Sequence, residues 1–153
     1  MKLRSYRPED CDALMALFHD TVHAVNAKDY SPAQLAAWAP PRLDRERWLT
    51  MLGGHYTLVA EMDGAIVGFG DLEGADYFDH LFVHKDHQGR GIAAALARGI
   101  EEEARRRGAG CITVAASITA KPFFEHRGYR VCRRQTVEVR GQKMTNFAME
   151  KAL

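Results

Sequence analysis

Apolar residues in the first part of the chain repeat at helical spacing. Those between Leu14 and Val25 recur every three or four positions, which predicts an amphipathic helix that ends near Ala27. The segment Pro8–Asp10 supplies the proline and the acidic first turn that favour a helix start. The preceding segment Lys2–Tyr6 alternates in polarity as a short strand does. We therefore expect a strand that leads into a helix.

Two shorter helices are predicted next. Ser31 and Gln34 have the spacing of a capping box, in which each side chain satisfies a free backbone N–H of the other residue. Pro40-Pro41 ends this second helix, because proline cannot continue one. A third short helix is expected around 44–52, before Gly53-Gly54.

The rest of the chain alternates between strands and helices. Two apolar runs rich in β-branched residues flank Asp63-Gly64, a strong signal for a two-residue hairpin. The remaining predicted elements are a third paired strand at 76–84, a long helix at 89–107 closed by Gly108, a buried strand at 111–117, a short helix at 120–126, and two final strands flanking Arg140-Gly141. The order βαα(α)βββαβαββ predicts one α/β (α+β) domain over residues 1–153, with no repeat and no linker.

Composition narrows the classes of function. Lysine and arginine total 21 against 20 acidic residues, so the net charge of +1 gives no reason to expect a nucleic-acid partner. The N-terminus lacks the apolar core of a signal peptide, and no uncharged apolar run reaches about 18 residues, so we expect no membrane partner and a cytoplasmic location. Cys11, Cys111 and Cys132 show no CxxC or CxxH spacing, which predicts reduced thiols rather than a disulfide framework or structural zinc.

The clearest candidate for chemistry is the glycine-rich segment His87–Ala93, between a strand and the long helix. Its glycines let the backbone approach a ligand, and the first N–H groups of a helix form a natural anion site. Arg90 adds one positive charge. The glycine spacing differs from a dinucleotide fingerprint, and the GxxxxGK pattern of a P-loop is absent. A pyrophosphate site and a connector without a ligand remain as alternatives.

The segment LFVHKDHQGRGIAAAL resembles the coenzyme A loop of the GNAT superfamily of N-acetyltransferases, whose pattern Gln88, Gly91 and Ala93 meet. A second landmark, ASITAKPFFEHRGY, and the element order resemble the same superfamily. The segments VNAKDYSPAQLAAWAP and TNFAMEK resemble a small uncharacterised bacterial subgroup of it. The resemblance implies a mixed, mostly antiparallel central sheet flanked by helices.

The resemblance also implies acetyl-CoA as cosubstrate and direct transfer of its acetyl group to a primary amine of a small molecule. The strand of Leu81 to Val83 would pair by its backbone with the pantetheine arm, and a backbone N–H there would polarise the thioester carbonyl. The residues expected at the cofactor are Leu81, Phe82, Val83, Gln88, Gly89, Arg90, Gly91, Ile92, Ala93 and Phe124. The alternative function is a non-catalytic acyl-CoA sensor or interaction module, and a homodimer stays open.

The catalytic side chains depart from the pattern of the superfamily. Many relatives carry a tyrosine acid where this chain has Phe124, which has no proton to give. Tyr129 is a substitute acid or a packing residue. Ser117 is expected near the pantetheine or the thiol, or as a helix N-cap.

Asp79 is the first candidate for the general base, with a solvent-facing or salt-bridged aspartate as the alternative. Strand alternation predicts that it shares a face with Leu81 and Val83 and that His80 points the other way. Tyr77 is a further candidate.

The acceptor pocket is expected to involve the N-terminal helices. The candidate residues are His23, Asn26, Asp29, Tyr30 and Trp38. Asp29 could attract a cationic amine, whereas Trp38 could instead be a core residue. His19 and His23 are one turn apart, but two histidines without a third ligand do not predict a metal site, so we expect no metal.

Overall fold

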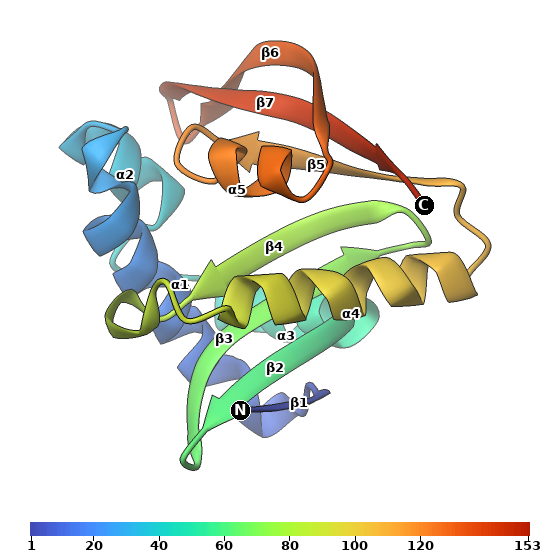
Figure 1. Ribbon diagram of the computed structural model, residues 1–153. Coiled ribbons are helices and arrows are strands. Elements are labelled where there is room, and N and C mark those ends of the chain that lie inside the picture. The colour runs from blue at the N-terminus through green and yellow to red at the C-terminus, as the bar shows by residue number, and fades with distance from the viewer.

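A mixed sheet of seven strands forms the centre of the molecule, in the order β1-β2-β3-β4-β5-β7-β6 (Figure 1). This computed structural model describes residues 1–153. The strands are β1 (Lys2–Ser5), β2 (Tyr56–Met62), β3 (Ala65–Glu73), β4 (Tyr77–Val83), β5 (Cys111–Ser117), β6 (Arg130–Val139) and β7 (Gln142–Ala152). All neighbours are antiparallel except β4 and β5, which are parallel. The predicted mostly antiparallel sheet is confirmed.

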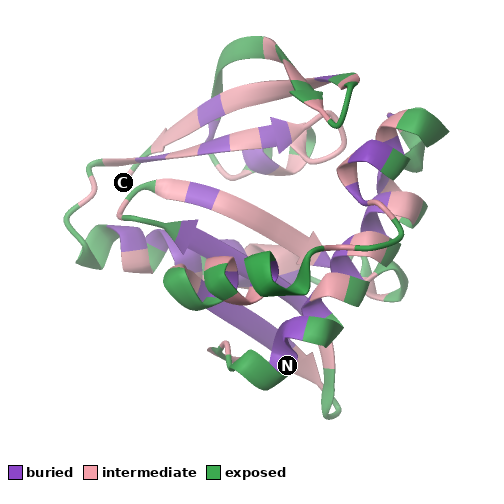
Figure 2. Ribbon diagram, turned by 180° about the vertical axis from the view of Figure 1, so that it is seen from behind, coloured by how far each residue is buried: buried purple, intermediate pink, exposed green.

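Helices cover both faces of the sheet. They are α1 (Cys11–Val25), α2 (Pro32–Trp38), α3 (Arg45–Gly54), α4 (Ile92–Arg106) and α5 (Lys121–His126), with short 3-10 turns at Pro8–Asp10, Asn26–Lys28 and Lys85–His87. One core lies under α4 and α5, and the other lies under α1, α2 and α3. β2 and β3 are mostly buried between two helical layers, whereas most of β4 is half-buried (Figure 2).

Local signals in the sequence account for several element boundaries. The Ser31 hydroxyl accepts the Gln34 N–H at 3.2 Å, and the Ser31 N–H donates to the Gln34 side chain at 2.8 Å, so the capping box is confirmed. Asp63 and Gly64 both have positive φ, 54° and 80°, as a tight hairpin turn needs. The helix predicted from residue 89 begins later, at Ile92, because Gly89 and Gly91 adopt left-handed conformations before it.

The burial of β5 differs from the prediction. Its residues alternate between buried and half-buried, whereas the continuous apolar run predicted a fully buried strand. The alternation arises because one face packs into the core beneath α4, while the other includes Ala115 and Ser117, which line a cavity.

The parallel strands β4 and β5 stay together over a short distance only. Two residue pairs join them, Tyr77 with Thr113 and Phe78 with Val114. Beyond these pairs the strands diverge, and β4 continues to Val83 with a partner on the β3 side alone (Figure 1). The divergence leaves one edge of β4 free in the middle of the sheet, where a ligand can pair with it.

A β-bulge interrupts β4 at Asp79. Asp71 of β3 is paired with His80, and the next residue, Leu72, is paired with Phe78, so Asp79 has no partner. A bulge changes the alternation of side chains and often lies beside an active site. Its effect on the orientation of Asp79 is described below.

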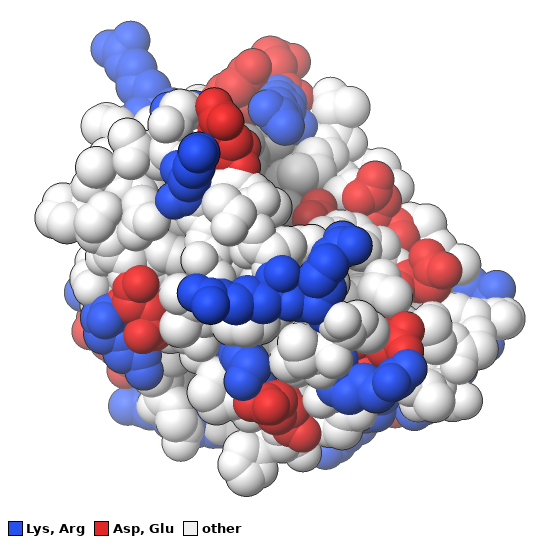
Figure 3. Space-filling model, turned by 90° about the horizontal axis from the view of Figure 1, so that it is seen from above, with Lys and Arg blue, Asp and Glu red and all other residues white.

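The surface carries both kinds of charge. Seen from the β6–β7 end, basic and acidic side chains are interspersed over the face (Figure 3). None of the helices combines the length and apolar character needed to cross a membrane. The three cysteines are free thiols.

Candidate functional site

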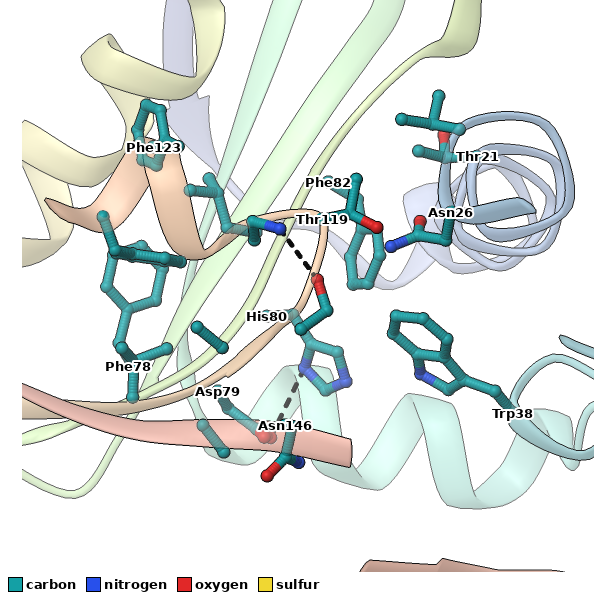
Figure 4. A pocket seen from close by; sticks show the side chains of 18 of the residues that line it. Thr21, Asn26, Trp38, Phe78, Asp79, His80, Phe82, Thr119, Phe123 and Asn146 are labelled. Atoms are coloured by element: carbon teal, nitrogen blue, oxygen red, sulfur yellow. Dashed lines mark hydrogen bonds and ion pairs between the residues drawn. The ribbon is translucent and has the colours of Figure 1, made fainter. Parts of the chain in front are cut away.

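A cavity of about 390 Å³ lies where β4 and β5 diverge, bounded by α1, α2, the α5 region and the β6–β7 ribbon. Its lining is mostly apolar. The lining includes these residues expected from the sequence: Asn26, Tyr30, Trp38, Asp79, Leu81, Phe82, Val83, Gln88, Ala93, Ser117 and Phe124. Residues from distant parts of the chain thus meet around one space, as Figure 4 shows for ten labelled side chains.

The loop before α4 presents free backbone donors. Gly89 and Gly91 have φ of 73° and 79°, a conformation that glycine adopts without a steric penalty. The N–H groups of residues 89–94 donate to no acceptor within the protein. Ile92 is only 1% exposed, so its side chain belongs to the core and its N–H alone can reach a ligand. Arg90 is exposed. The loop can therefore bind an anion at the positive end of the helix dipole.

The free edge of β4 offers backbone groups to the cavity. The His84 N–H donates to Val67 of β3 at 2.8 Å, and N–H directions alternate along a strand, so those of Leu81 and Val83 face away from β3. The Val83 carbonyl accepts from the Thr21 hydroxyl at 3.1 Å and from the Gln88 side-chain amide at 2.7 Å. The N–H groups of Leu81 and Val83 remain available to an extended ligand.

A buried cluster of two histidines and two aspartates adjoins the cavity. Asp71 is fully buried, and its carboxylate accepts hydrogen bonds from His55 Nδ1 at 2.9 Å and from His80 Nδ1 at 3.1 Å. It also accepts the His80 backbone N–H at 2.6 Å. Asp79 Oδ2 lies 3.4 Å from His80 Nδ1 and 3.7 Å from His55 Nδ1. The assignment of the hydrogens follows from these partners.

The orientation predicted for Asp79 is wrong. Leu81 and Val83 pack against the core beneath α4, whereas the Asp79 carboxylate lies beside His80, on the side of the other core. The bulge at Asp79 is the reason, because the extra residue breaks the period-two alternation on which the prediction rested. Asp79 and His80 are thereby brought to the same end of the cavity (Figure 4).

Burial and charge shift the ionisation of all four groups. Burial favours a higher pKa for Asp71, but the charge of His80 and the hydrogen bonds from both histidines outweigh it and lower that pKa. Burial opposes a charged His80, yet Asp71 raises the pKa of His80 above its ordinary value. The hydrogen bond with Asp71 raises the pKa of His55, and burial raises the pKa of Asp79.

Three groups of this cluster could offer ligand atoms to a metal ion, since the atoms of His55, Asp71 and Asp79 lie within 4.8 Å of one another. The contacts of Asp71 at 2.9 and 3.1 Å are hydrogen-bonding distances, and they fill both of its carboxylate oxygens. Both oxygens of Asp71 therefore already accept hydrogen bonds from the two imidazoles.

Tyr129 lies outside the cavity lining, which removes the basis for its assignment as the acid. Its hydroxyl donates to Glu101 at 2.8 Å in the core, and burial, with the charge of Glu101, strongly raises the pKa of Tyr129. Glu101 also accepts from Arg127 at 2.6 Å and from Lys151 at 3.2 Å. Sequence reasoning could not see this pairing, because 28 positions separate Tyr129 from Glu101.

Ser117 and Phe124 lie on the β5–α5 side of the cavity. The Ser117 hydroxyl accepts the Ala120 N–H at 3.0 Å, so it caps the turn before α5 while it lines the cavity. Phe124 is 3% exposed and packs against Phe78 and Tyr129. Both residues therefore line the cavity, whereas the N-cap of α5 is Ala120 rather than Ser117.

The residues expected around the acceptor divide into two groups. Asn26, Tyr30 and Trp38 line the cavity, and Figure 4 shows Asn26 and Trp38 facing the same space as His80. The two residues outside the lining are engaged elsewhere. His23 Nε2 bonds to a backbone carbonyl in the α2–α3 connection at 2.7 Å, and Asp29 accepts the Thr119 hydroxyl at 2.8 Å.

Sequence reasoning missed part of the cavity. The missed lining residues include His80, Thr119, Phe123, Val137, Val139, Met144 and Asn146. Those on β6 and β7 could not be placed, since only the folded order of the sheet brings β7 beside β5. The Asn146 Oδ1 atom is buried without a partner, which makes it available to a ligand donor.

Comparisons with known proteins agree with this geometry. Residues 26–151 match the family described as "Acetyltransferase (GNAT) domain". The uncharacterized N-acetyltransferase YafP of Escherichia coli (strain K12) is 38% identical over 150 residues, which cover 97% of this chain and 94% of that protein.

Solved structures give the same result. A GCN5-related N-acetyltransferase from Rhodopseudomonas palustris superposes with a TM-score of 0.97 at 39% identity, covering 99% of this chain and 95% of that one. YncA of Salmonella typhimurium, an acetyltransferase solved with acetyl-CoA, shares the fold at a TM-score of 0.75 and 20% identity, covering 100% of this chain and 94% of its own. The diverging strands, the glycine loop and these matches together establish that the chain belongs to the GNAT family of acetyltransferases.

Proposed function

We propose that this enzyme transfers the acetyl group of acetyl-CoA directly to the primary amine of a small molecule. The observation that carries the proposal is the row of unpaired N–H groups at residues 89–94, next to the free edge of β4. The loop would hold the pyrophosphate through these donors, with the positive end of the α4 dipole adding to the attraction. Arg90, exposed beside them, would supply one charge-assisted contact.

The pantetheine arm would run along β4 towards the cavity. An extended amide chain can pair with the free N–H groups of Leu81 and Val83 as an added strand does. One of these N–H groups would then point at the thioester oxygen, where negative charge develops in the transition state. Ser117, on the facing strand, uses its oxygen for the Ala120 N–H and keeps its own hydrogen to donate to the sulfur end of the arm.

The acceptor would enter from the side of α1, α2 and the β6–β7 ribbon. Tyr30, Trp38 and Phe82 supply aromatic surface there, which suits the apolar body of a small amine and attracts its cationic form. Asp79 is the carboxylate of the lining, and it favours the same positive charge. We therefore propose a small amine with an apolar body as the acceptor class.

No tyrosine stands where an acid for the sulfur is expected, since Phe124 occupies that position. A thiolate is a tolerable leaving group, so positioning and backbone polarisation can carry most of the reaction. The same Phe124 supports the second candidate, a protein that binds acyl-CoA without turnover.

Calorimetric titration with acetyl-CoA tests the shared premise of both candidates. Specific binding with thermal stabilisation is expected. No heat and no stabilisation at millimolar ligand would contradict both of them.

A further inference from the structure

A chain of hydrogen bonds connects the cavity with a surface depression on the side of α3. His80 lines the cavity, and His55 lines the depression together with Glu46 and Glu73. Between them lies Asp71, which is 0% exposed and bonded to Nδ1 of both rings. Burial of a carboxylate costs free energy unless hydrogen-bond partners compensate for it. The Asp71 carboxylate therefore holds the two imidazoles in fixed positions.

We propose that His80 is the general base of the acetyl transfer and that Asp71 positions it, with His55 as the outer partner of Asp71. The proposal rests on the amine acetylation proposed above and assigns a residue that sequence reasoning had set aside in favour of Asp79.

The geometry of His80 suits a base. Its Nδ1 lies 3.1 Å from both oxygens of Asp71, which fixes the neutral ring with the hydrogen on Nδ1. Its Nε2 then carries a lone pair and has no hydrogen-bond partner in the protein. Figure 4 shows this second ring nitrogen facing the side of Trp38, where the acceptor is proposed to bind. The side chain is 17% exposed, so a substrate amine can reach it.

Asp79 is less suited to the same task. Its nearer oxygen is directed at the imidazole nitrogens of His80 and His55, at 3.4 and 3.7 Å. Burial raises the pKa of Asp79, whereas the charges of His80 and His55 lower it, so this carboxylate is engaged as a counter-ion of the two imidazoles. Asp79 acts in this account as a negative charge that attracts the ammonium group and favours the imidazolium.

The reaction balances with these groups. The ammonium of the acceptor gives one proton to His80 Nε2, and the freed lone pair forms the N–C bond at the thioester carbonyl. The C–S bond then breaks, and its electron pair leaves with the sulfur. The second proton of the attacking nitrogen passes to that thiolate, which gives the amide and free coenzyme A. The imidazolium, stabilised by Asp71, returns its proton to solvent after product release.

Three acidic groups raise the pKa of His80 against burial: Asp71 and Glu73 from β3 and Asp79 from β4. His55, after the end of α3, shares the Asp71 carboxylate with His80. Asp71 raises the pKa of His80 most among the three acidic groups. Loss of Asp71 should therefore lower the pKa of His80. Loss of His55 should raise it, because Asp71 then has His80 as its remaining imidazole partner.

Nitrogen NMR of the free protein tests the arrangement without any substrate. The neutral His80 ring should carry its hydrogen on Nδ1, with a pKa above 6.5, the ordinary value. That pKa should fall in Asp71→Asn and rise in His55→Gln. His55→Gln removes a ring at the rim and keeps the buried carboxylate, so it still tests the proposal if Asp71→Asn does not fold. A hydrogen on Nε2, or a His80 pKa that neither variant moves, would overturn the proposal even in an active enzyme.

Kinetics test the catalytic role. His80→Gln should lower kcat/KM at neutral pH by about 10²- to 10⁴-fold and leave the Kd for acetyl-CoA unchanged. The acidic limb of the pH profile of kcat/KM should move to lower pH in Asp71→Asn and to higher pH in His55→Gln, because it follows the pKa of His80. His126→Gln, an exposed histidine on α5, is the matched control and should behave as the wild type.

The opposite pattern would assign the base to Asp79. If Asp79→Asn lost activity over that range while His80→Gln kept it, the proposal would be wrong. Absence of turnover with every amine would instead contradict the proposed function, and the NMR result would still decide the His80–Asp71 arrangement.

Discussion

Gln88 donates its side-chain N–H to the carbonyl of Val83 across 2.7 Å, and this bond joins the end of β4 to the loop before α4. It ties together the two backbone segments proposed to hold coenzyme A. The Val83 carbonyl is otherwise held by Thr21 of α1. Gln88 therefore helps to fix the position of the loop relative to the strand.

Removal of this bond should weaken cofactor binding. Gln88→Ala loses one hydrogen bond that orders the loop, with a net value of about 0.5–1.5 kcal/mol. The Kd for acetyl-CoA, measured by calorimetry, should rise by about 2- to 12-fold. Gln135→Ala on β6, outside the cavity lining, serves as the control and should bind as the wild type. Equal affinities of Gln88→Ala and the wild type would remove Gln88 from the binding site.

A side chain at Gly91 should block the same site. Gly91 has φ of 79°, where a β-branched residue is strained, and the space beside it is open. Valine there would strain the loop by about 1–3 kcal/mol and would occupy the path of the pyrophosphate. We expect Gly91→Val to raise the Kd for acetyl-CoA at least about tenfold, a change of about 1.4 kcal/mol.

Gly110→Val is the matched control, because Gly110 also has open space around it but an ordinary φ. It should bind acetyl-CoA normally. If the two valine variants bound equally well, the pyrophosphate would have to lie elsewhere.

The sequence predicted those features of the fold that depend on residues close together in the chain. The capping box at Ser31, the turn at Asp63-Gly64 and the glycine loop at Gly91 each depend on residues a few positions apart, and all three are present. The loop could be predicted as an anion site because its glycines and its place before a helix are visible in the sequence, and that site stays a prediction.

Long-range pairing and a single extra residue account for what was missed. The bulge at Asp79 arises from the register of β3 against β4, and nothing in the sequence marks it. Because of that bulge, His80 rather than Leu81 lies beside the Asp79 carboxylate. No sequence motif singled out Asp71 or His55, which only the fold joins to His80 in one hydrogen-bonded chain.

Tyr129 should matter for stability and little for catalysis. Its hydroxyl bonds to the buried carboxylate of Glu101, and a hydrogen bond to a charged group is worth about 1.5–3 kcal/mol. Tyr129→Phe should decrease the free energy of unfolding by an amount near the lower end of that range, because Glu101 keeps its bonds with Arg127 and Lys151. The value of kcat should be unchanged.

Tyr6→Phe is the control for this experiment, because the buried Tyr6 hydroxyl makes no hydrogen bond to a charged group. Chemical denaturation and turnover should be measured on both variants. Loss of turnover in Tyr129→Phe with unchanged stability would return Tyr129 to the role of the acid.

Glu101 should make stability depend on acid pH. Burial opposes its ionisation, but its hydrogen bonds with Arg127 and Tyr129 outweigh burial and lower the pKa of Glu101 below the ordinary 4.5. Because the folded-state pKa is the lower one, the stabilisation is fully present above the unfolded-state value and is lost as the pH falls through the folded-state value.

Glu101→Gln should therefore cost about 3–5 kcal/mol of unfolding free energy at neutral pH, as expected when one partner of a buried ion pair is removed. The difference from the wild type should shrink as the pH falls below about 4.5. Urea denaturation between neutral pH and about pH 3 measures it. A difference that stays constant over this range would show that Glu101 stabilises the fold by packing rather than by charge.

The most direct test of the whole account is turnover with a panel of small primary amines. Turnover is measured by the release of free thiol and by mass spectrometry of the products. The account predicts that at least one amine with an apolar body gains an acetyl group, with one free thiol released for each amide formed. Tight binding of acetyl-CoA without acetylation of any amine in the panel would contradict it and would favour the acyl-CoA sensor.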